Sequence, residues 1–108
     1  VNVMHTTLQG GLHYKLSLES DMVRIATAEI ATYNEVAEVV NLSIEICEPK
    51  ELNEIVRNVD SFLATTGADV VYVNASNFAD ALIDEFTSLG YANDWRGGED
   101  VLYKIFFF

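Results

Sequence analysis

The sequence predicts an α+β domain in which a mixed, mostly antiparallel sheet carries two main helices. Apolar and polar residues alternate through most of residues 12–47, which is the period of half-buried strands. Two later stretches, 49–66 and 77–89, repeat apolar residues at three-and-four spacing, as amphipathic helices do. A continuous apolar run separates them, and two strand-like runs follow the second. The 108 residues therefore predict a single domain over 1–108 with the element order β-β-β-α-β-α-β-β.

Three strands joined by short turns are expected first. Leu12–Glu19 alternates regularly, and the polar run Glu19-Ser20-Asp21 favours a turn. Met22–Thr32 and Val36–Cys47 follow, with a second turn between them at Tyr33-Asn34-Glu35. Such short connections predict an antiparallel meander. Residues 1–10 are only weakly patterned and are compatible with an edge strand.

The phase of the alternation changes within the third of these strands. Ala37 and Val39 share one phase, and the apolar residues from Val40 to Ile46 take the opposite one. A β-bulge leaves such an adjacent apolar pair, because one extra residue moves every later side chain to the other face. A strand buried on both faces would leave the same pattern, so both interpretations stay open.

A helix is expected to begin at Pro49, whose missing N–H costs nothing at the first helical position. Gly67 fits the left-handed position that ends a helix. The continuous β-branched run Val70–Val73 that follows is typical of a central strand covered on both faces. The apolar stripe of this first helix consists of Leu52, Ile55, Val56, Val59, Phe62 and Leu63.

A second helix is expected to begin at a cap formed by Ser76 or Asn77, with Asp80 in its first turn. Gly90 is expected to end it. Its predicted buried stripe consists of Ala79, Leu82, Ile83, Phe86 and Leu89.

Two strands, Tyr91–Trp95 and Val101–Phe108, are expected around a turn at Arg96–Asp100, in which two glycines can take positive φ. The tail would place phenylalanine rings on both faces of a sheet, so either both faces are covered or another chain covers one. This predicts a homodimer or a protein partner. Trp95 is a further interface candidate, because tryptophan is enriched in binding hot spots, and packing under the hairpin is its alternative. The predicted interface residues are Trp95, Phe106, Phe107 and Phe108.

The net charge of −11 is the strongest bulk signal. The six basic residues are scattered, whereas a phosphate-backbone binder needs a concentrated cationic face, so direct nucleic-acid binding is not expected. Two interpretations remain. The acidic surface serves solubility, or it mimics nucleic acid and docks a basic partner.

Composition also bears on location and metal binding. The single cysteine, Cys47, excludes an intramolecular disulfide and fits a reducing, cytoplasmic setting. No apolar run approaches the roughly 20 residues of a membrane helix, so no membrane association is expected. His5 and His13 do not stand at zinc-ligand spacing with cysteine or acidic residues, and no metal site is expected.

The element order, with a long third strand that feeds a helix, resembles the GNAT superfamily of acyl-CoA-dependent N-acetyltransferases. The segment from Phe86 to Tyr91, FTSLGY, followed by a glycine turn and a closing strand, is similar to that family's common end, an aromatic residue four positions before a Gly-aromatic pair. The resemblance covers roughly residues 12–107. It implies that a bulge near Val39-Val40 opens the gap in which the pantetheine of acyl-CoA lies. The family's first two helices, which help to form the acceptor site, have no room in residues 1–11.

The residues that should hold the cofactor depart from the family pattern. In the family, a glycine-containing loop presents backbone amides to the CoA pyrophosphate at a helix N-terminus. The matching junction Cys47–Asn53 has no glycine, and Pro49 removes one donor. Its glutamates would repel phosphates by on the order of a kcal/mol for each close pair. The candidate cofactor contacts that remain are Ile46, Cys47, Lys50, Asn74 and Asn77.

The catalytic positions depart as well. The resemblance implies a tyrosine at the position of Phe86, whose phenol would act as general acid, and phenylalanine has no proton to give. Glu45 and Glu38 alternate with apolar residues on the third strand, where a general base of the family can lie. A solvent-facing position on the strand is the simpler explanation of either residue. The residues that could replace the missing phenol are Tyr91, Tyr72 and Cys47.

The expected function is an acetyltransferase-like domain with a degenerate acyl-CoA site, used for binding or assembly without a resident cofactor. One alternative is a divergent N-acetyltransferase that takes acetyl-CoA and a small amine. The other is an acidic inhibitor that mimics nucleic acid, such as a small viral protein.

Overall fold

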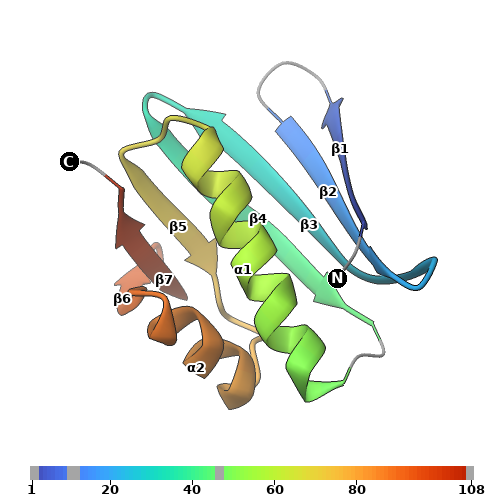
Figure 1. Ribbon diagram of the computed structural model, residues 1–108. Coiled ribbons are helices and arrows are strands. Elements are labelled where there is room, and N and C mark those ends of the chain that lie inside the picture. The colour runs from blue at the N-terminus through green and yellow to red at the C-terminus, as the bar shows by residue number, and fades with distance from the viewer. Residues whose placement is uncertain (1–2, 10–12, 46–47, 107–108) are drawn as a thin grey trace.

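The computed structural model describes residues 3–9, 13–45 and 48–106, and of these the side chains from residue 13 onward. Within this part of the chain, one seven-stranded sheet has the spatial order β1-β2-β3-β4-β5-β7-β6 (Figure 1). Every neighbouring pair is antiparallel except β4 and β5, which are parallel. The strands are β1 (Val3–Gln9), β2 (His13–Ser20), β3 (Val23–Tyr33), β4 (Val36–Ile44), β5 (Val70–Asn74), β6 (Ala92–Arg96) and β7 (Glu99–Ile105).

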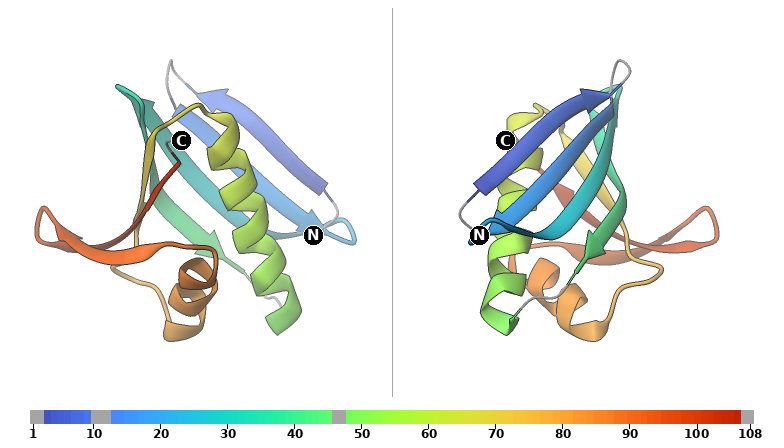
Figure 2. Two further views of the ribbon diagram at one scale, coloured as in Figure 1. Left: turned by 60° about the vertical axis from the view of Figure 1, so that its left-hand side comes forward. Right: turned by 90° about the vertical axis from the view of Figure 1, so that its right-hand side faces the viewer.

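Two helices, α1 (Pro49–Thr65) and α2 (Asp80–Ser88), lie against the same face of the sheet (Figure 1). The expected α+β class, the mixed sheet and the element order are confirmed, with β1 as an added edge strand. The β6–β7 hairpin projects away from the rest of the sheet, as both views of Figure 2 show.

The turns form close to where the sequence predicts them, although Met22, expected to begin a strand, lies in the first turn. Asp21 and Met22 join β2 to β3, and Asn34 and Glu35 join β3 to β4, and all four have positive φ. Two consecutive positive φ values match the right-handed twist of the flanking strands, so each hairpin closes with a two-residue turn. Gly97 and Gly98 close the β6–β7 hairpin in the same way.

The core lies between the sheet and α1. On the helix, the buried residues are spaced three or four apart, as predicted. Small residues on β3, among them Ala26 and Ala28, lie beneath the helix and let it approach the sheet. The fully buried side chains include Leu16, Leu18, Ile30, Val39, Ile55, Val56, Val59, Leu63, Val71, Val73, Phe86 and Leu102.

The phase change in β4 is a β-bulge. Ile30 of β3 pairs with Val39, whereas Glu29 pairs with Asn41, so Val40 is an extra residue on β4. The alternative of a strand buried on both faces is wrong, because Val40 and Asn41 are exposed. Beyond the bulge, Leu42 again pairs with Ala28, which returns its side chain to the helix-covered face.

Three local expectations need correction. α2 begins at Asp80 without a side-chain cap, so Ser76 and Asn77 do not cap it. The cause is Asn74, whose Oδ1 accepts the Ser76 N–H at 3.1 Å and turns the chain before the helix can start. Ala79, which was expected in the buried stripe of this helix, is exposed. In β5, only Val71 and Val73 are fully buried, because no helix covers the other face of this strand in the described part of the chain.

Candidate functional site: a cleft between β4 and β5

The bulge at Val40 marks the point where two parallel strands separate. The pairing between β4 and β5 covers only Val36–Val39 against Val70–Val73. β4 continues beside β3 as far as Ile44, whereas the chain after β5 turns away toward α2. The two strands therefore diverge, and a cleft opens between β4 and the start of α2.

Two adjoining cavities occupy this cleft and share Leu42, Asn77 and Phe78. The larger, of about 290 Å³, lies on the helix side and is mainly apolar. The smaller, of about 100 Å³, lies at the bulge and is mainly polar. The larger cavity is lined by Leu42, Ile44, Leu52, Asn77, Phe78, Ala79, Ala81 and Leu82, and the smaller by Val40, Asn41, Leu42, Asn74, Asn77 and Phe78.

Of the expected cofactor contacts, the structure brings Asn74 and Asn77 to the cleft. Both polar atoms of the Asn74 side-chain amide have partners: Oδ1 accepts the Ser76 N–H, and Nδ2 donates to Glu99 Oε2 at 3.4 Å. Ile46 and Cys47 lie outside the described residues. Lys50 is exposed at the start of α1 and forms an ion pair of 3.7 Å with Glu48, an interaction that solvent screens.

The N-terminus of α1, beside the cleft, is closed by its own carboxylates. Glu48 and Glu51 form a capping box, in which the Glu51 side chain accepts the Glu48 N–H at 2.9 Å and the Glu48 side chain faces the Glu51 N–H. The Glu48 N–H, and after it the Ser20 hydroxyl, hold the pKa of Glu51 below its usual value. The Glu51 carboxylate is therefore charged at neutral pH and lies, with the Glu48 side chain, at the helix end where an anion could otherwise bind.

The two candidate bases lie toward opposite ends of β4, Glu38 near its start and Glu45 directly after its last residue. Glu45 comes seven positions after Glu38, or about 23 Å along an extended chain. Glu45 accepts the Arg24 Nε–H at 3.2 Å on the exposed surface. Glu38 is half-buried and accepts the Tyr33 hydroxyl at 3.2 Å. The structure does not bring the two together.

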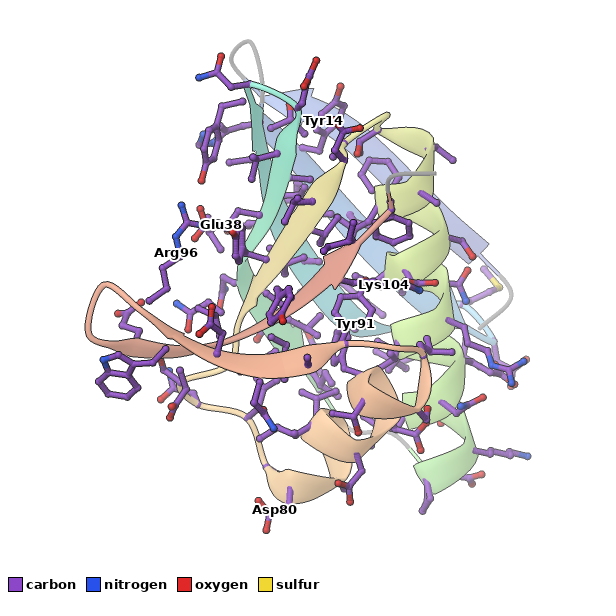
Figure 3. The ribbon with its side chains drawn as sticks, turned by 90° about the vertical axis from the view of Figure 1, so that its left-hand side faces the viewer. Tyr14, Glu38, Asp80, Tyr91, Arg96 and Lys104 are labelled. Carbon is purple, nitrogen blue, oxygen red and sulfur yellow. The ribbon has the colours of Figure 1, made fainter. Side chains whose placement is uncertain are left out.

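Glu38 lies on the face of the sheet that the helices leave open. It pairs with Tyr72 of β5, and the Arg96 guanidinium lies 4.0 Å from the centre of the Tyr72 ring. Figure 3 shows Glu38 and Arg96 on this side of the molecule, away from Tyr91 and Lys104.

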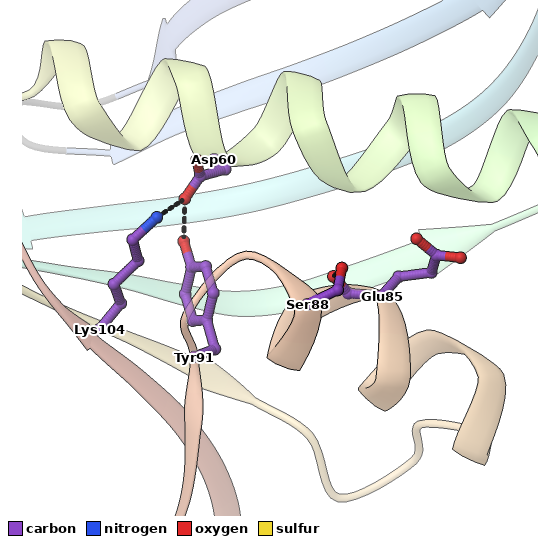
Figure 4. A network of polar contacts seen from close by, with 5 residues as sticks. All are labelled: Asp60, Glu85, Ser88, Tyr91 and Lys104. Carbon is purple, nitrogen blue, oxygen red and sulfur yellow. Dashed lines mark hydrogen bonds and ion pairs between the residues drawn. The ribbon is translucent and has the colours of Figure 1, made fainter.

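Tyr91 is withdrawn from the cleft. Its hydroxyl donates to Asp60 Oδ1 of α1 at 2.9 Å, and Lys104 Nζ of β7 lies 3.1 Å from the same oxygen (Figure 4). Burial, followed by the charge of Asp60 and this hydrogen bond, raises the pKa of Tyr91 far above its ordinary value. A phenol held in this way is a poor proton donor at neutral pH.

Phe86 occupies the place of the expected catalytic phenol and is fully buried. Its ring stacks on Phe78, with centroids 5.8 Å apart, and meets the Tyr91 ring edge-on at 5.1 Å. A lining residue of the cleft, Phe78, is thus fixed from behind by the core.

Sequence patterns alone missed the Asp60–Tyr91–Lys104 cluster. Asp60 lies outside the predicted apolar stripe of α1, where an acidic residue gives no sign of a distant partner. The available signal was Lys104, a lone cation inside the apolar run from Val101 to Phe108. A cation in such a run needs a partner, since a buried unpaired charge is costly.

Replacing Tyr91 with phenylalanine is expected to lower the free energy of unfolding by about 1.5–3 kcal/mol at neutral pH, because a hydrogen bond to a charged group is lost. Chemical denaturation measures this loss. Tyr33→Phe is the matched control, since its hydroxyl bonds Glu38 on the exposed surface, and it should change stability by less than about 1 kcal/mol. Equal effects of the two substitutions would contradict a special role of the cluster.

The raised pKa of Tyr91 also predicts a loss of stability in alkali. The unfolded chain loses this proton near the ordinary pKa of 10.0, whereas the folded chain retains it. The contribution is complete below that pH and falls above it, by up to about 1.4 kcal/mol per pH unit. Between about pH 10 and 11, the wild type should lose stability faster than Tyr91→Phe. Parallel curves for the two proteins would show that Tyr91 titrates normally.

The predicted interface residues lie in different surroundings. Trp95 is 66% exposed on the projecting hairpin, so the alternative prediction that it packs under the hairpin is wrong. Phe106 is half-buried against the core, with Lys104 Nζ 4.8 Å from the centre of its ring. Phe107 and Phe108 lie outside the described residues.

Two further classes of site find no support in the described residues. No group of three or more His, Cys, Asp or Glu side chains among them could hold a metal ion. None of the described helices combines the length and apolar character needed to cross a membrane.

No protein-family model and no curated protein sequence matches this chain. Solved structures do match. PaiA N-acetyltransferase from Thermoplasma acidophilum, in complex with coenzyme A, has a TM-score of 0.69 at 13% identity, covering 88% of this chain and 62% of that one. An acetyltransferase from Bacillus subtilis, in complex with CoA, has a TM-score of 0.66 at 11% identity, with 84% and 74% covered.

The ribosomal-protein-S18-alanine N-acetyltransferase from Escherichia coli has a TM-score of 0.64 at 18% identity, with 88% of this chain and 68% of that chain covered. Of the Thermoplasma protein, 62% is covered, so this chain spans less than two thirds of that protein's length. At such identities the likeness concerns the fold. The fold is that of the GNAT N-acetyltransferases, as the element order had suggested.

Proposed function

We propose that this acetyltransferase-like fold does not hold acyl-CoA in the family's manner and acts as a non-catalytic binding or assembly module. The cleft between β4 and β5 is retained, which supports a binding role. The observation that carries the proposal is the Glu48–Glu51 capping box at the N-terminus of α1.

The electrostatics of this helix end oppose a pyrophosphate. The Glu51 carboxylate accepts the N–H of Glu48, the residue that caps the helix, and the Glu48 side chain faces the first-turn N–H of Glu51. A phosphate placed about 4 Å from either one would meet a repulsion of roughly 1 kcal/mol in bulk water and up to about 4 kcal/mol near a protein surface. Lys50, the cation closest in sequence, lies against Glu48.

The proton-transfer groups support the same proposal. Phe86 has no proton to donate, and the Tyr91 phenol is held by Asp60. Neither supplies a general acid to a departing thiolate.

Thermal unfolding with and without acetyl-CoA tests this function. The wild type should show no rise in melting temperature at millimolar acetyl-CoA, because a ligand stabilises only the state that it binds. In the double variant Glu48→Ser, Glu51→Gln, the capping box is kept and both charges are removed. This variant should respond more strongly to acetyl-CoA than the wild type.

The matched control is Glu29→Gln, Glu35→Gln, which removes two exposed carboxylates from β3 and the β3–β4 turn. It changes the net charge equally and should leave the response unchanged. A clear stabilisation of the wild type by acetyl-CoA would refute the proposal.

The second candidate is a divergent N-acetyltransferase that acts on a small amine. It is favoured by Glu38, which is half-buried on β4 two positions before the bulge. A carboxylate there could accept an amine proton on the open face of the sheet, close to the bulge. This candidate predicts transfer from acetyl-CoA that Glu38→Gln abolishes and Glu45→Gln spares, whereas no transfer by the wild type supports the binding module.

The binding module requires a partner, either another protein or a second copy of this chain. Exposure of Trp95 on a projecting hairpin supports its role in a contact. Light scattering should give a dimeric mass that Trp95→Ser reduces, if the partner is a second copy. A monomeric mass at micromolar concentration would leave a different protein as the partner.

A further inference from the structure

The edge of β4 beyond the bulge is open on the side that faces β5. Asn41–Ile44 pairs with β3 on one side, while the pairing with β5 has already ended at Val39. In a strand, backbone N–H and C=O groups point alternately to the two sides. Among the described strands, none takes up the groups that point from Asn41–Ile44 toward the cleft. Such an edge can accept an extended peptide as an added strand.

The cavity beside this edge can receive a side chain of such a peptide. Leu42 and Leu82 contribute apolar surface from β4 and α2, and Leu52 contributes it from α1. Its volume of about 290 Å³ accommodates one large aliphatic side chain with room to spare. Alternate side chains of a strand point to the same face, so a single apolar residue enters the cavity and its neighbours face outward.

The charges around the cleft determine which residues can flank the apolar residue in the bound peptide. The segment Glu45–Glu51 carries three carboxylates, of which Glu45 pairs with Arg24 and Glu48 with Lys50 on the exposed surface. α2 carries three carboxylates and no basic residue. An anionic ligand or a second copy of this chain, which has a net charge of −11, would be repelled, whereas a basic segment would be attracted.

We propose that the cleft between β4 and α2 binds an extended basic peptide segment of a partner protein, paired to Asn41–Ile44 and anchored by one aliphatic side chain in the cavity. This rests on the proposed function, because acyl-CoA would fill the same cleft. The open strand edge supplies affinity, the cavity selects the anchor, and the surrounding carboxylates select the flanking charge.

Fluorescence anisotropy with defined peptides tests this proposal. The probe is labelled Lys-Thr-Lys-Leu-Lys-Thr-Lys, compared with its twin Glu-Thr-Glu-Leu-Glu-Thr-Glu and with a form in which alanine replaces leucine. The basic leucine peptide should bind at least tenfold more tightly than either twin. A form methylated on alternate backbone nitrogens should lose binding, because it cannot donate to the strand edge.

Two helix-surface variants locate the site. Ala81→Arg places a long cation at the cavity and should weaken binding at least tenfold. Ala64→Arg, on the exposed surface of α1 and outside this cavity, is the matched control and should bind like the wild type. Both alanines are exposed helical positions at which arginine is well tolerated.

The outcomes separate this proposal from the proposed function. Equal binding of the acidic twin, or an Ala81→Arg variant that binds like the wild type, would overturn the peptide proposal. If neither peptides nor acetyl-CoA bind, the peptide proposal fails and the non-catalytic function stands. If acetyl-CoA binds and displaces the peptide, the proposed function fails while the cleft remains a peptide site.

Discussion

Replacing Phe86 with alanine is expected to lower the free energy of unfolding by about 3–5 kcal/mol, the cost of removing a large buried ring. Phe86 is fully buried and contacts the rings of Phe78 and Tyr91. Its loss would leave a cavity behind the cleft and free Phe78, so ligand binding in the cleft should weaken as well. Chemical denaturation monitored by circular dichroism measures the stability change.

Ile105→Ala is the control for this prediction, because that side chain is 61% exposed and its truncation should cost less than about 1 kcal/mol. Phe86→Tyr carries a separate test. The added hydroxyl has no space in the core, so we expect destabilisation of about 1–3 kcal/mol and no acetyl transfer. A stable tyrosine variant with acetyltransferase activity would show that Phe86 is the only lost part of an active site.

Deletion of Val40 is expected to abolish ligand binding in the cleft without unfolding the protein. Val39 and Asn41 already pair with consecutive residues of β3, Ile30 and Glu29. Removing the extra residue therefore joins two regular ladders and keeps every later side chain on its present face. The strand loses the bend of the bulge, so β4 can stay beside β5 and the cleft closes.

The measurement is the affinity of the basic leucine peptide, which should fall at least tenfold while cooperative unfolding is retained. Val40→Ala, which keeps the extra residue, is the control and should bind like the wild type. Unchanged affinity after the deletion would mean that the bulge does not form the binding site.

Local periodicity accounts for most of the fold. The presence of short turns between the strands, the limits of α1 and the end of α2 at Gly90 all follow from neighbours in sequence, and the structure confirms them. The start of α2 was misplaced because the side chain of Asn74 bonds the backbone two residues later, in competition with the helix. Propensity alone does not decide such a competition.

The features of the site that the sequence did not predict depend on contacts between residues far apart in the chain. The bulge at Val40 was one of two interpretations until pairing with β3 showed which residue is extra. The exposure of one face of β5 depends on where the helices pack. The cluster of Asp60, Tyr91 and Lys104 joins residues 31 and 44 positions apart, which no local pattern specifies.

The capping box could have been predicted from the sequence. Glu48 and Glu51 stand at the spacing of a reciprocal cap, and their repulsion of phosphates was expected from their charge alone. The structure adds that the Glu51 carboxylate accepts the Glu48 N–H and that the Glu48 side chain faces the Glu51 N–H. We therefore expect this end of α1 to be closed to anions.

An NMR titration of the first-turn amides of α1 tests that claim most directly. Inorganic pyrophosphate and acetyl-CoA would be added separately to uniformly labelled protein, and the amide signals of Glu51, Leu52 and Asn53 followed. We predict no saturable change in these signals up to millimolar ligand, because the Glu48 and Glu51 carboxylates already occupy this end of the helix. Saturable shifts confined to these amides would contradict the account and restore a phosphate site at α1.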